Sequence, residues 1–190
     1  MNEEVFTNKT LKGIGASPGI KFGRIRLIER GKIHVTKRKT KEELVEKEIL
    51  RFKNALKHGI EELNKIKNTI PDDEIRKHAF IIDAHILILQ DNFLLNAVTD
   101  EIRAEKVNAE WALDIVVSKF LASFEKIDDS YLRERGQDLK YIYDRLIRIL
   151  IKGKASDLDG IGIKGKSIIV AHDLSPADTI QLNLNKISGF

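Results

Sequence analysis

The sequence predicts an α/β (or α+β) fold in which a helical bundle is inserted into a small α/β domain. Strand-like patterns occur near both ends of the 190-residue chain, before Val35 and again at 167–171. Between Thr40 and Gly153, apolar residues instead recur every three to four positions, as they do in amphipathic helices. A chain with this order leaves a β region, builds a bundle and returns. We therefore expect three segments, at residues 1–36, 37–153 and 154–190.

The first segment is typical of a glycine-rich turn followed by a strand. In KFGRIRLI, Phe22, Ile25 and Leu27 lie in near alternation among basic residues, with Gly23 interrupting. The preceding GIGASPG has the spacing GxGxxxG and no strand before it, so it does not match the dinucleotide-binding fingerprint. We interpret it as a backbone turn.

The central segment is expected to contain consecutive helices. The first begins with a capping box of Thr40 and Glu43 and ends at Ile70, before Pro71, which gives a length of about 45 Å. The later helices are expected to run from Asp72 to Gln90, from Asn92 to about Lys106, onward from an N-cap at Asn108, and from Asp129 or Ser130 to the glycine stop at Gly153.

The last segment returns to a strand and the start of a helix. SIIVA is typical of a short buried strand, and Ser175, Pro176 and Asp178 supply an N-cap, a proline at the first helical position and an acid at the third. The preceding GIGIKGKS matches the P-loop pattern, but a P-loop needs a strand before it and a helix after it. Here the strand follows the match, so we interpret it as a turn.

Composition and charge exclude several classes of site. The chain has no cysteine, which excludes disulfides, thiolate metal sites and cysteine nucleophiles. Its densest basic run, Lys37-Arg38-Lys39, contains no aromatic residue to stack on a base, which favours a solvated loop over a nucleic-acid site. His78 and His85 lie about 10.5 Å apart along one helix, too far to share a metal ion, so no metal site is expected. No uncharged apolar run approaches about 20 residues, and we expect a cytoplasmic protein.

The second helix carries more apolar surface than a surface helix needs. One stripe consists of Ile75, Ala79, Ile82, Ile86 and Leu89, and a second stripe beside it consists of Ile81, His85 and Ile88. Two explanations stay open at this point. Either the helix is buried centrally in the bundle, or one stripe packs the bundle while the other docks a partner.

Four stretches of the chain resemble Enzyme I of the bacterial sugar phosphotransferase system, the phosphoenolpyruvate-protein phosphotransferase family. GIGASPGIKFG resembles that family's opening GI-x-ASPGI-x-FG motif, and DAHILILQD resembles its helical GHI-x-LL-x-D segment. DDSYLRERGQDLKYIYDRLIRIL and HDLSPADTIQLNLNKISGF resemble two later motifs, so the match runs in order over nearly the whole chain. The resemblance implies a helical bundle of the HPr-binding type inserted into a partial swivelling phosphohistidine α/β domain.

The resemblance also implies a partner, the small phosphocarrier protein HPr. The family enzyme transfers a phosphoryl group from phosphoenolpyruvate through an active histidine to HPr, for sugar uptake. Matching positions place the docking surface at Ile81, Ala84, His85, Ile88, Leu94, Phe124, Leu132 and Arg135. Where the family carries acidic residues at the start of the docking helix, this chain has Arg76 and Lys77, which would weaken docking unless the partner is charged differently.

By the same resemblance, the catalytic centre is incomplete in this chain. The active histidine is expected beyond Phe190, so the chain is expected to be inactive alone, and Thr179 matches a threonine that orients the histidine ring. No cofactor is expected in this part, because the family binds Mg²⁺ in a C-terminal domain. The parent is expected to be a homodimer, and the fragment to self-associate through exposed strand edges.

Three other interpretations remain open from the sequence. The chain could be a stand-alone HPr-binding regulatory module without catalysis, or part of a nitrogen-system paralogue of Enzyme I. The third is a basic helical module that binds nucleic acid, which a steep loss of affinity with salt would reveal.

Overall fold

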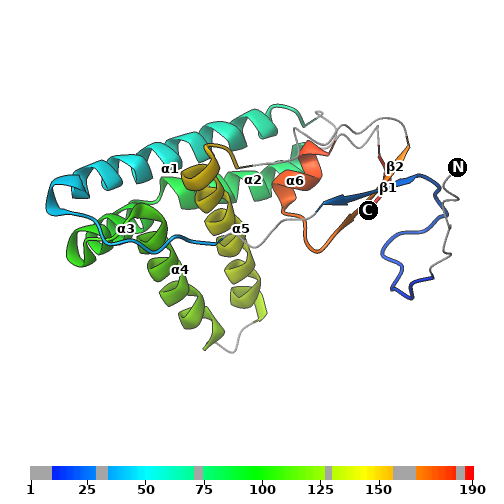
Figure 1. Cartoon of the computed structure of the whole chain (residues 1–190). Coiled ribbons are helices and arrows are strands. Elements are labelled where there is room, and N and C mark those ends of the chain that lie inside the picture. The colour runs from blue at the N-terminus through cyan, green and yellow to red at the C-terminus, as the bar shows by residue number, and fades with distance from the viewer. Residues whose placement is uncertain (1–9, 29–33, 71–74, 127–129, 156–165, 183–186) are drawn as a thin grey trace, which may run out of the picture.

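A helical bundle and a small parallel sheet make up the structure (Figure 1). The computed structural model describes residues 10–28, 34–70, 75–126, 130–155, 166–182 and 187–190, without the side chains of 75–79, 125 and 130–135. The order of elements is a strand, a series of helices and a return to strands, as the sequence predicts. The predicted fold class is therefore confirmed.

The bundle is built from α1 (Val45–Lys67), α2 (Ile75–Gln90), α3 (Asn92–Glu105), α4 (Ala109–Glu125) and α5 (Ser130–Lys152). α1 packs against all four of the other helices, so it forms the centre of the bundle. Its buried stripe recurs every three to four residues, as predicted, and includes Ile49, Phe52, Leu56, Leu63 and Ile66. Gly153 follows α5 with φ +75°, a left-handed conformation that ends the helix there, also as predicted.

One predicted helix cap is wrong, and a second is right in position but lacks the side-chain bond. Thr40 does not cap the first helix, which begins after Lys41 with a short 3₁₀ turn (Glu42–Leu44) and no side-chain cap; the Thr40 amide instead donates to the Lys106 carbonyl oxygen at 2.7 Å. Asn108 stands at the N-cap position of α4, but its side chain makes no cap bond. Glu48 of α1 accepts the Ala109 amide at 3.1 Å in its place. Contacts distant in sequence thus override both local capping signals.

The sheet has three parallel strands in the order β1 (Arg24–Ile28), β2 (Ser167–Ala171) and β3 (Ile187–Gly189). β1 and β2 pair in register from Arg24 with Ser167 to Ile28 with Ala171, so the whole bundle lies within the connection between two neighbouring strands. Gly23 allows this close approach, because a Cβ there would lie 3.1 Å from the Lys166 carbonyl oxygen.

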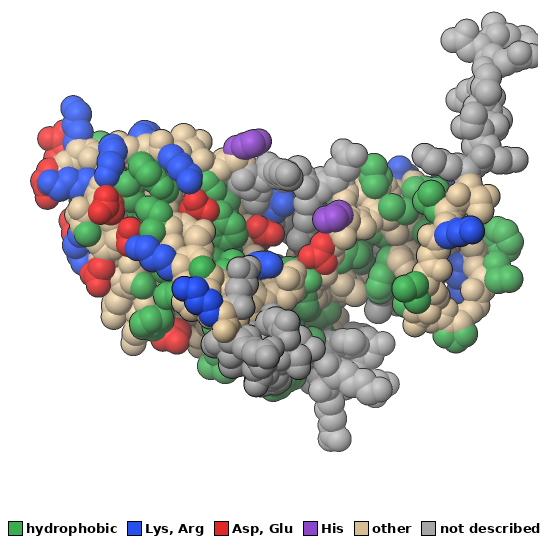
Figure 2. Space-filling model, turned by 90° about the horizontal axis from the view of Figure 1, so that it is seen from below, with side chains coloured by type: hydrophobic (Ala, Val, Ile, Leu, Met, Phe, Trp, Pro, Cys, Tyr) green, Lys and Arg blue, Asp and Glu red, His purple; other side chains and the backbone are tan. Residues whose placement is uncertain are grey.

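The two faces of the sheet differ in exposure. Ile28, Ile169 and Leu182 form a small core on the covered side. Ile25 and Leu27 lie exposed on the other side, and Phe22, just before the strand, is exposed as well. Apolar side chains accordingly gather on the strand-containing part of Figure 2, whereas acidic and basic groups intermingle over the bundle. The β1 face is thus an apolar surface that the described residues leave uncovered.

α6 (Pro176–Gln181) joins the sheet to the bundle. It packs against α1 and α2, and it lies between the bundle and the strands in Figure 1. Ala177 belongs to the bundle's buried core, and Ile180 packs against that core. The proposed boundaries at residues 36/37 and 153/154 stay a prediction. α6 lies after the second boundary, but its side chains contribute to the core of the bundle.

Within the described residues, no single helix is long and apolar enough to cross a membrane. The pair Phe80–Gln90 and Asn92–Glu105 passes by length and composition together, with a bend of 42° between its halves. Both helices contribute buried side chains to the core of the bundle.

Candidate functional site

Helix α2 has a buried inner face and an apolar outer face. Ile82, Ile86 and Leu89 are buried in the bundle core. A quarter-turn or more around the helix, Phe80 and Leu87 are 65% and 66% exposed. Ala84, Ile81 and Ile88 lie between these faces and are half-buried. The exposed residues are Phe80 and Leu87 and not the predicted second stripe of Ile81, His85 and Ile88, in which His85 is buried. An outer apolar face is nevertheless what the docking explanation requires, and docking itself stays a prediction.

The predicted docking residues fall into three groups. Ile81, Ala84, Ile88 and Phe124 are partly exposed on α2 and α4. His85 and Leu94 are buried, so in this structure they support their exposed neighbours from beneath. The side chains of Leu132 and Arg135, like those of Arg76 and Lys77, lie outside the described residues. The role of the whole set in docking stays a prediction.

An aromatic pair that the sequence analysis missed lies on α3 and α4. Phe93 is 65% exposed and stacks on Phe120, with ring centroids 5.3 Å apart and an interplanar angle of 19°. Such stacking holds an exposed ring in place and keeps it available for contact. The sequence carries a signal for the outer face of α2, because Phe80, Ala84 and Leu87 recur at i, i+4 and i+7. It carries no local signal for the contact between Phe93 and Phe120.

A close packing of helices fixes Phe124 beside the start of α5. A Cβ at Gly136 would lie 3.9 Å from Leu121 Cδ2 and 3.9 Å from Phe124 Cβ. α4 and α5 therefore approach closely at the residue that follows Arg135 in sequence. This places the backbone of the predicted α5 docking residues next to the predicted α4 docking residue.

Beneath the outer face, His85 forms a buried polar contact between α2 and α5. Its Nε2 lies 3.3 Å from Asp138 Oδ1, and the residue is 2% exposed. Burial lowers the pKa of His85, while the hydrogen bond and negative charge of Asp138 act in the opposite direction without overcoming it. At neutral pH the ring is therefore uncharged and joins two helices without adding a buried charge.

Thr179 lies in the wall of a pocket next to the sheet. The pocket, of about 520 Å³, is lined by Ile168, Ile169, Val170, Ala171, Asp173, Leu174, Thr179 and Phe190. The predicted N-cap at Ser175 is confirmed as a full capping box, in which the Ser175 amide donates to Asp178 Oδ2 at 2.8 Å. The Thr179 hydroxyl donates to the Ser175 carbonyl oxygen at 3.1 Å. With its proton used in this way, the hydroxyl can offer an incoming group a lone pair.

The basic run Lys37-Arg38-Lys39 is engaged with the bundle. Lys37 pairs with Asp114 at 3.3 Å, and Lys39 pairs with Glu105 at 3.3 Å while its Nζ lies 5.6 Å from the centre of the Trp111 ring. The run is an exposed loop, as predicted, whose side chains also make surface ion pairs with α3 and α4. Its cations have partners in this structure, which argues against a free nucleic-acid patch.

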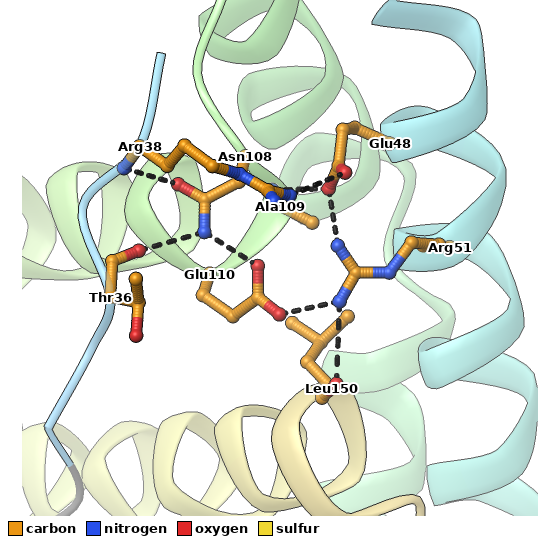
Figure 3. Close-up of polar contacts among 8 residues, drawn as sticks. All are labelled: Thr36, Arg38, Glu48, Arg51, Asn108, Ala109, Glu110 and Leu150. Atoms are coloured by element: carbon orange, nitrogen blue, oxygen red, sulfur yellow. Dashed lines mark hydrogen bonds and ion pairs between the residues drawn. The ribbon is translucent and has the colours of Figure 1, made fainter. Parts of the chain in front are cut away.

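A buried polar network secures the same segment (Figure 3). Arg51 donates to Glu48 Oε2 and Glu110 Oε1, each at 2.5 Å, and to the Leu150 carbonyl oxygen at 3.3 Å. Burial alone would lower the pKa of Arg51, but the hydrogen bonds and charges of Glu110 and Glu48 raise it. The segment that leads into the bundle, residues 34–40, is called the linker below. Asn108 joins the network to its backbone at Thr36 and Arg38. The network joins α1, α4 and the end of α5 to the segment before the bundle, and we interpret it as structural.

Among the described residues, no group of three or more His, Cys, Asp or Glu side chains is placed to hold a metal ion. The described features with functional potential include the apolar outer face of α2, the aromatic pair of α3 and α4, and a pocket containing Thr179. This combination suits the binding of another protein beside an α/β unit better than catalysis by the described residues alone.

Comparison with models of protein families shows which family the chain belongs to. Residues 12–135 match the model of the N-terminal region of PEP-utilising enzymes. The chain belongs to this family. The match covers the first strand, α1 to α4 and the start of α5, so it includes the helices that carry the exposed apolar residues of α2 and the aromatic pair.

Individual relatives agree with this assignment. Over 94% of its length the chain is 34% identical to the phosphoenolpyruvate-protein phosphotransferase of Haemophilus influenzae, and over 95% of its length it is 37% identical to that of Bacillus subtilis. It spans 31% of the length of each of these relatives. The solution structure of an Enzyme I protein matches with a TM-score of 0.78 and 32% identity, over 94% of this chain and 71% of that one. The family resemblance inferred from the sequence motifs is confirmed.

Proposed function

We propose that this chain is the HPr-docking part of a phosphoenolpyruvate-protein phosphotransferase, Enzyme I. The parent would transfer a phosphoryl group from phosphoenolpyruvate to its own histidine and then to HPr. In this proposal, residues 37–153 form the docking domain, and residues 1–36 and 154–190 form part of the phosphohistidine domain. The cytoplasmic location, the homodimeric parent and the inactivity of the chain alone stay predictions that accompany it.

The observation that carries the proposal is the apolar outer face of α2. A helix with its inner face packed into a bundle gains nothing in folding from exposing Phe80 and Leu87. Burying these side chains against an apolar patch on a small protein would stabilise a complex by removing that surface from water. The stacked Phe93 and Phe120 on α3 and α4 are a further apolar group, with Phe93 exposed, and in this proposal they take part in the same contact.

Thr179 would serve the histidine side of the reaction. Because its hydroxyl donates to the Ser175 carbonyl oxygen, it can accept a hydrogen bond from one ring N–H of an imidazole entering the pocket. That contact would fix the tautomer and leave the other ring nitrogen unprotonated, as a nucleophile toward phosphorus requires. The described residues supply no metal ligands for this step. Mg²⁺ would therefore be held by parts of the parent other than these.

The test is a titration of the isotopically labelled chain with HPr from the same organism, followed through backbone amide shifts. We expect shifts on the α2 outer face, at Phe93 and near Phe124. Leu87→Glu should raise the dissociation constant by about tenfold or more, because docking would bury a carboxylate in an apolar contact. Leu50→Glu is the matched control, since Leu50 is also an exposed leucine but lies on α1.

The two variants separate docking from general effects of added charge. Equal binding by the wild-type chain and both variants would show that the α2 face is not the docking surface. Absence of any shift in the folded wild-type chain, at high HPr concentration, would contradict the proposed partner itself.

A further inference from the structure

A hydrogen bond links the bundle to the pocket. Tyr141, on α5, donates from its hydroxyl to Asp173 Oδ1 at 3.2 Å. Asp173 lies between β2 and α6, so the bond joins residues 32 positions apart that belong to the bundle and to the strand-containing part. It therefore bridges two parts of the chain that the proposed reaction would have to hold together.

On the pocket side, Asp173 is connected rigidly to Thr179. Both residues line the same pocket. The capping box of Ser175 and Asp178 fixes the start of α6 immediately after Asp173, and Thr179 itself bonds back to the Ser175 carbonyl oxygen. A change in the position of Asp173 would consequently be transmitted to the helix that carries Thr179.

On the bundle side, Tyr141 is connected to the docking helix. Its ring centroid lies 6.4 Å from that of His85 on α2, with the rings tilted by 46°. His85 is held to Asp138, which precedes Tyr141 by nearly one turn of α5. The hydroxyl that reaches Asp173 is thus positioned by the same buried contacts that fix α2 from beneath.

Another contact between the bundle and the strand-containing part, among the described residues, is apolar. Ala177 and Ile180 of α6 pack against the bundle core. Apolar contacts resist separation, but they have little directional preference, so a helix of this length could rock on them. A hydrogen bond is directional and constrains the angle as well as the distance. The two contacts therefore have different tasks, with α6 providing attachment and Tyr141 providing orientation.

We propose that Tyr141 is a positioning residue that holds the pocket of Asp173 and Thr179 in a fixed orientation relative to the outer face of α2. The orientation is a property of the free chain, so it can be measured without a partner. The role of this orientation in phosphoryl transfer rests on the proposed function. In that function, the docked HPr must present its acceptor in line with the phosphoryl group on a histidine at the pocket.

The experiment compares Tyr141→Phe with Tyr143→Phe in the complete chain. Tyr143 is a matched control, because it lies on the same helix and its hydroxyl also donates to a carboxylate, Asp114, at 3.0 Å, but within the bundle. Residual dipolar couplings of backbone amides would give the orientation of β2 and α6 relative to α1–α5. Hydrogen exchange would report on the protection of β2 and α6.

Tyr141→Phe should change the fitted orientation of β2 and α6 and speed exchange there about fivefold, while the bundle couplings stay the same. Tyr143→Phe should leave both measurements unchanged in β2 and α6. Unchanged couplings in Tyr141→Phe, or equal changes in the two variants, would overturn the proposal.

Variants of the acceptor provide a second test from the exposed side of the bond. Asp173→Ala should reproduce the effect of Tyr141→Phe, whereas Asp173→Asn, which keeps an acceptor oxygen, should retain the wild-type orientation. The opposite pattern would overturn the proposal. A wild-type chain that fails to bind HPr but shows the expected response to Tyr141→Phe would contradict the proposed function and leave this inference standing.

Discussion

The side-chain amide of Asn108 donates a hydrogen bond of 2.8 Å to the carbonyl oxygen of Thr36, 72 residues earlier in the chain. Its side-chain oxygen accepts the Arg38 amide at 3.0 Å, and the same amide nitrogen also donates to Glu110 at 2.8 Å. The Asn108 side chain therefore both donates to and accepts from the linker backbone, as the backbone of a neighbouring strand would.

Removing this amide should destabilise the whole chain. We expect Asn108→Ala to lower the free energy of unfolding by about 2 kcal/mol, because it removes two part-buried bonds to the linker and the buried bond to Glu110. Urea denaturation measures the change. Asn54→Ala is the control, since Asn54 is exposed on α1. Similar losses in the two variants would show that the linker contacts contribute little.

The ion pairs of Arg51 should be far more sensitive than those of the surface. Arg51→Met would remove the guanidinium that pairs with Glu110 and would leave Glu48 with Arg38 at 3.4 Å. The carboxylates of Glu110 and Glu48 are 8% and 7% exposed, so we expect a cost of about 3 kcal/mol. Arg103→Met breaks exposed pairs with Glu46 and Asp100 and should cost about 0.5 kcal/mol or less. Chemical denaturation of both variants at neutral pH tests the contrast, which equal losses would refute.

Stability should fall in mild acid because of His85. Its pKa is lowered in the folded state, chiefly by burial, so below about pH 6.5 the unfolded chain takes up a proton that the folded chain resists. The stability is thus fully present above about pH 6.5 and falls as the pH drops toward the lowered pKa, by up to about 1.4 kcal/mol per pH unit.

Denaturant curves across this pH range measure the effect in variants of two histidines. His85→Gln should lose this part of the pH dependence. His58→Gln should keep it, because His58 is a half-exposed histidine paired with Glu62. If His85→Gln shows the same pH dependence as the wild-type chain, another group is responsible.

The chain is expected to self-associate through the exposed apolar face of β1. Ile25 lies on this face, in a strand at one edge of the described sheet. Ile25→Lys should therefore reduce association, because an edge charge opposes the pairing of strands between molecules. Sedimentation velocity over a range of concentrations detects the change, with Leu50→Lys on α1 as the control. A wild-type chain that is monomeric at every concentration would contradict the prediction.

The sequence predicts the helices well because their signals are local. The stripe of α1 and the stop at Gly153 depend on side chains within a few turns of each other, and the Ser175 capping box lies within four residues. Each of these signals survives in the folded structure because no distant contact competes with it. The order of strands and helices follows from the same local patterns.

The features that sequence reasoning missed all depend on distant contacts. Asn108 has the residue type of an N-cap, but the linker backbone competes for its side chain and Glu48 takes over the helix terminus. The stacking of Phe93 on Phe120 and the bond from Tyr141 to Asp173 join separate elements. The spacing of apolar residues in the sequence does not predict such contacts, because they depend on how whole helices pack.

The insertion of Ala177 into the bundle core has a consequence for cooperativity. A residue that is 1% exposed and surrounded by side chains of the bundle cannot be withdrawn without opening an apolar cavity there. The sheet and the bundle should therefore melt in a single two-state transition. A polypeptide limited to residues 37–153 would lack Ala177 in its core and should unfold at a lower temperature. The bundle and the sheet, although they come from separate segments of the sequence, should therefore unfold as one cooperative unit.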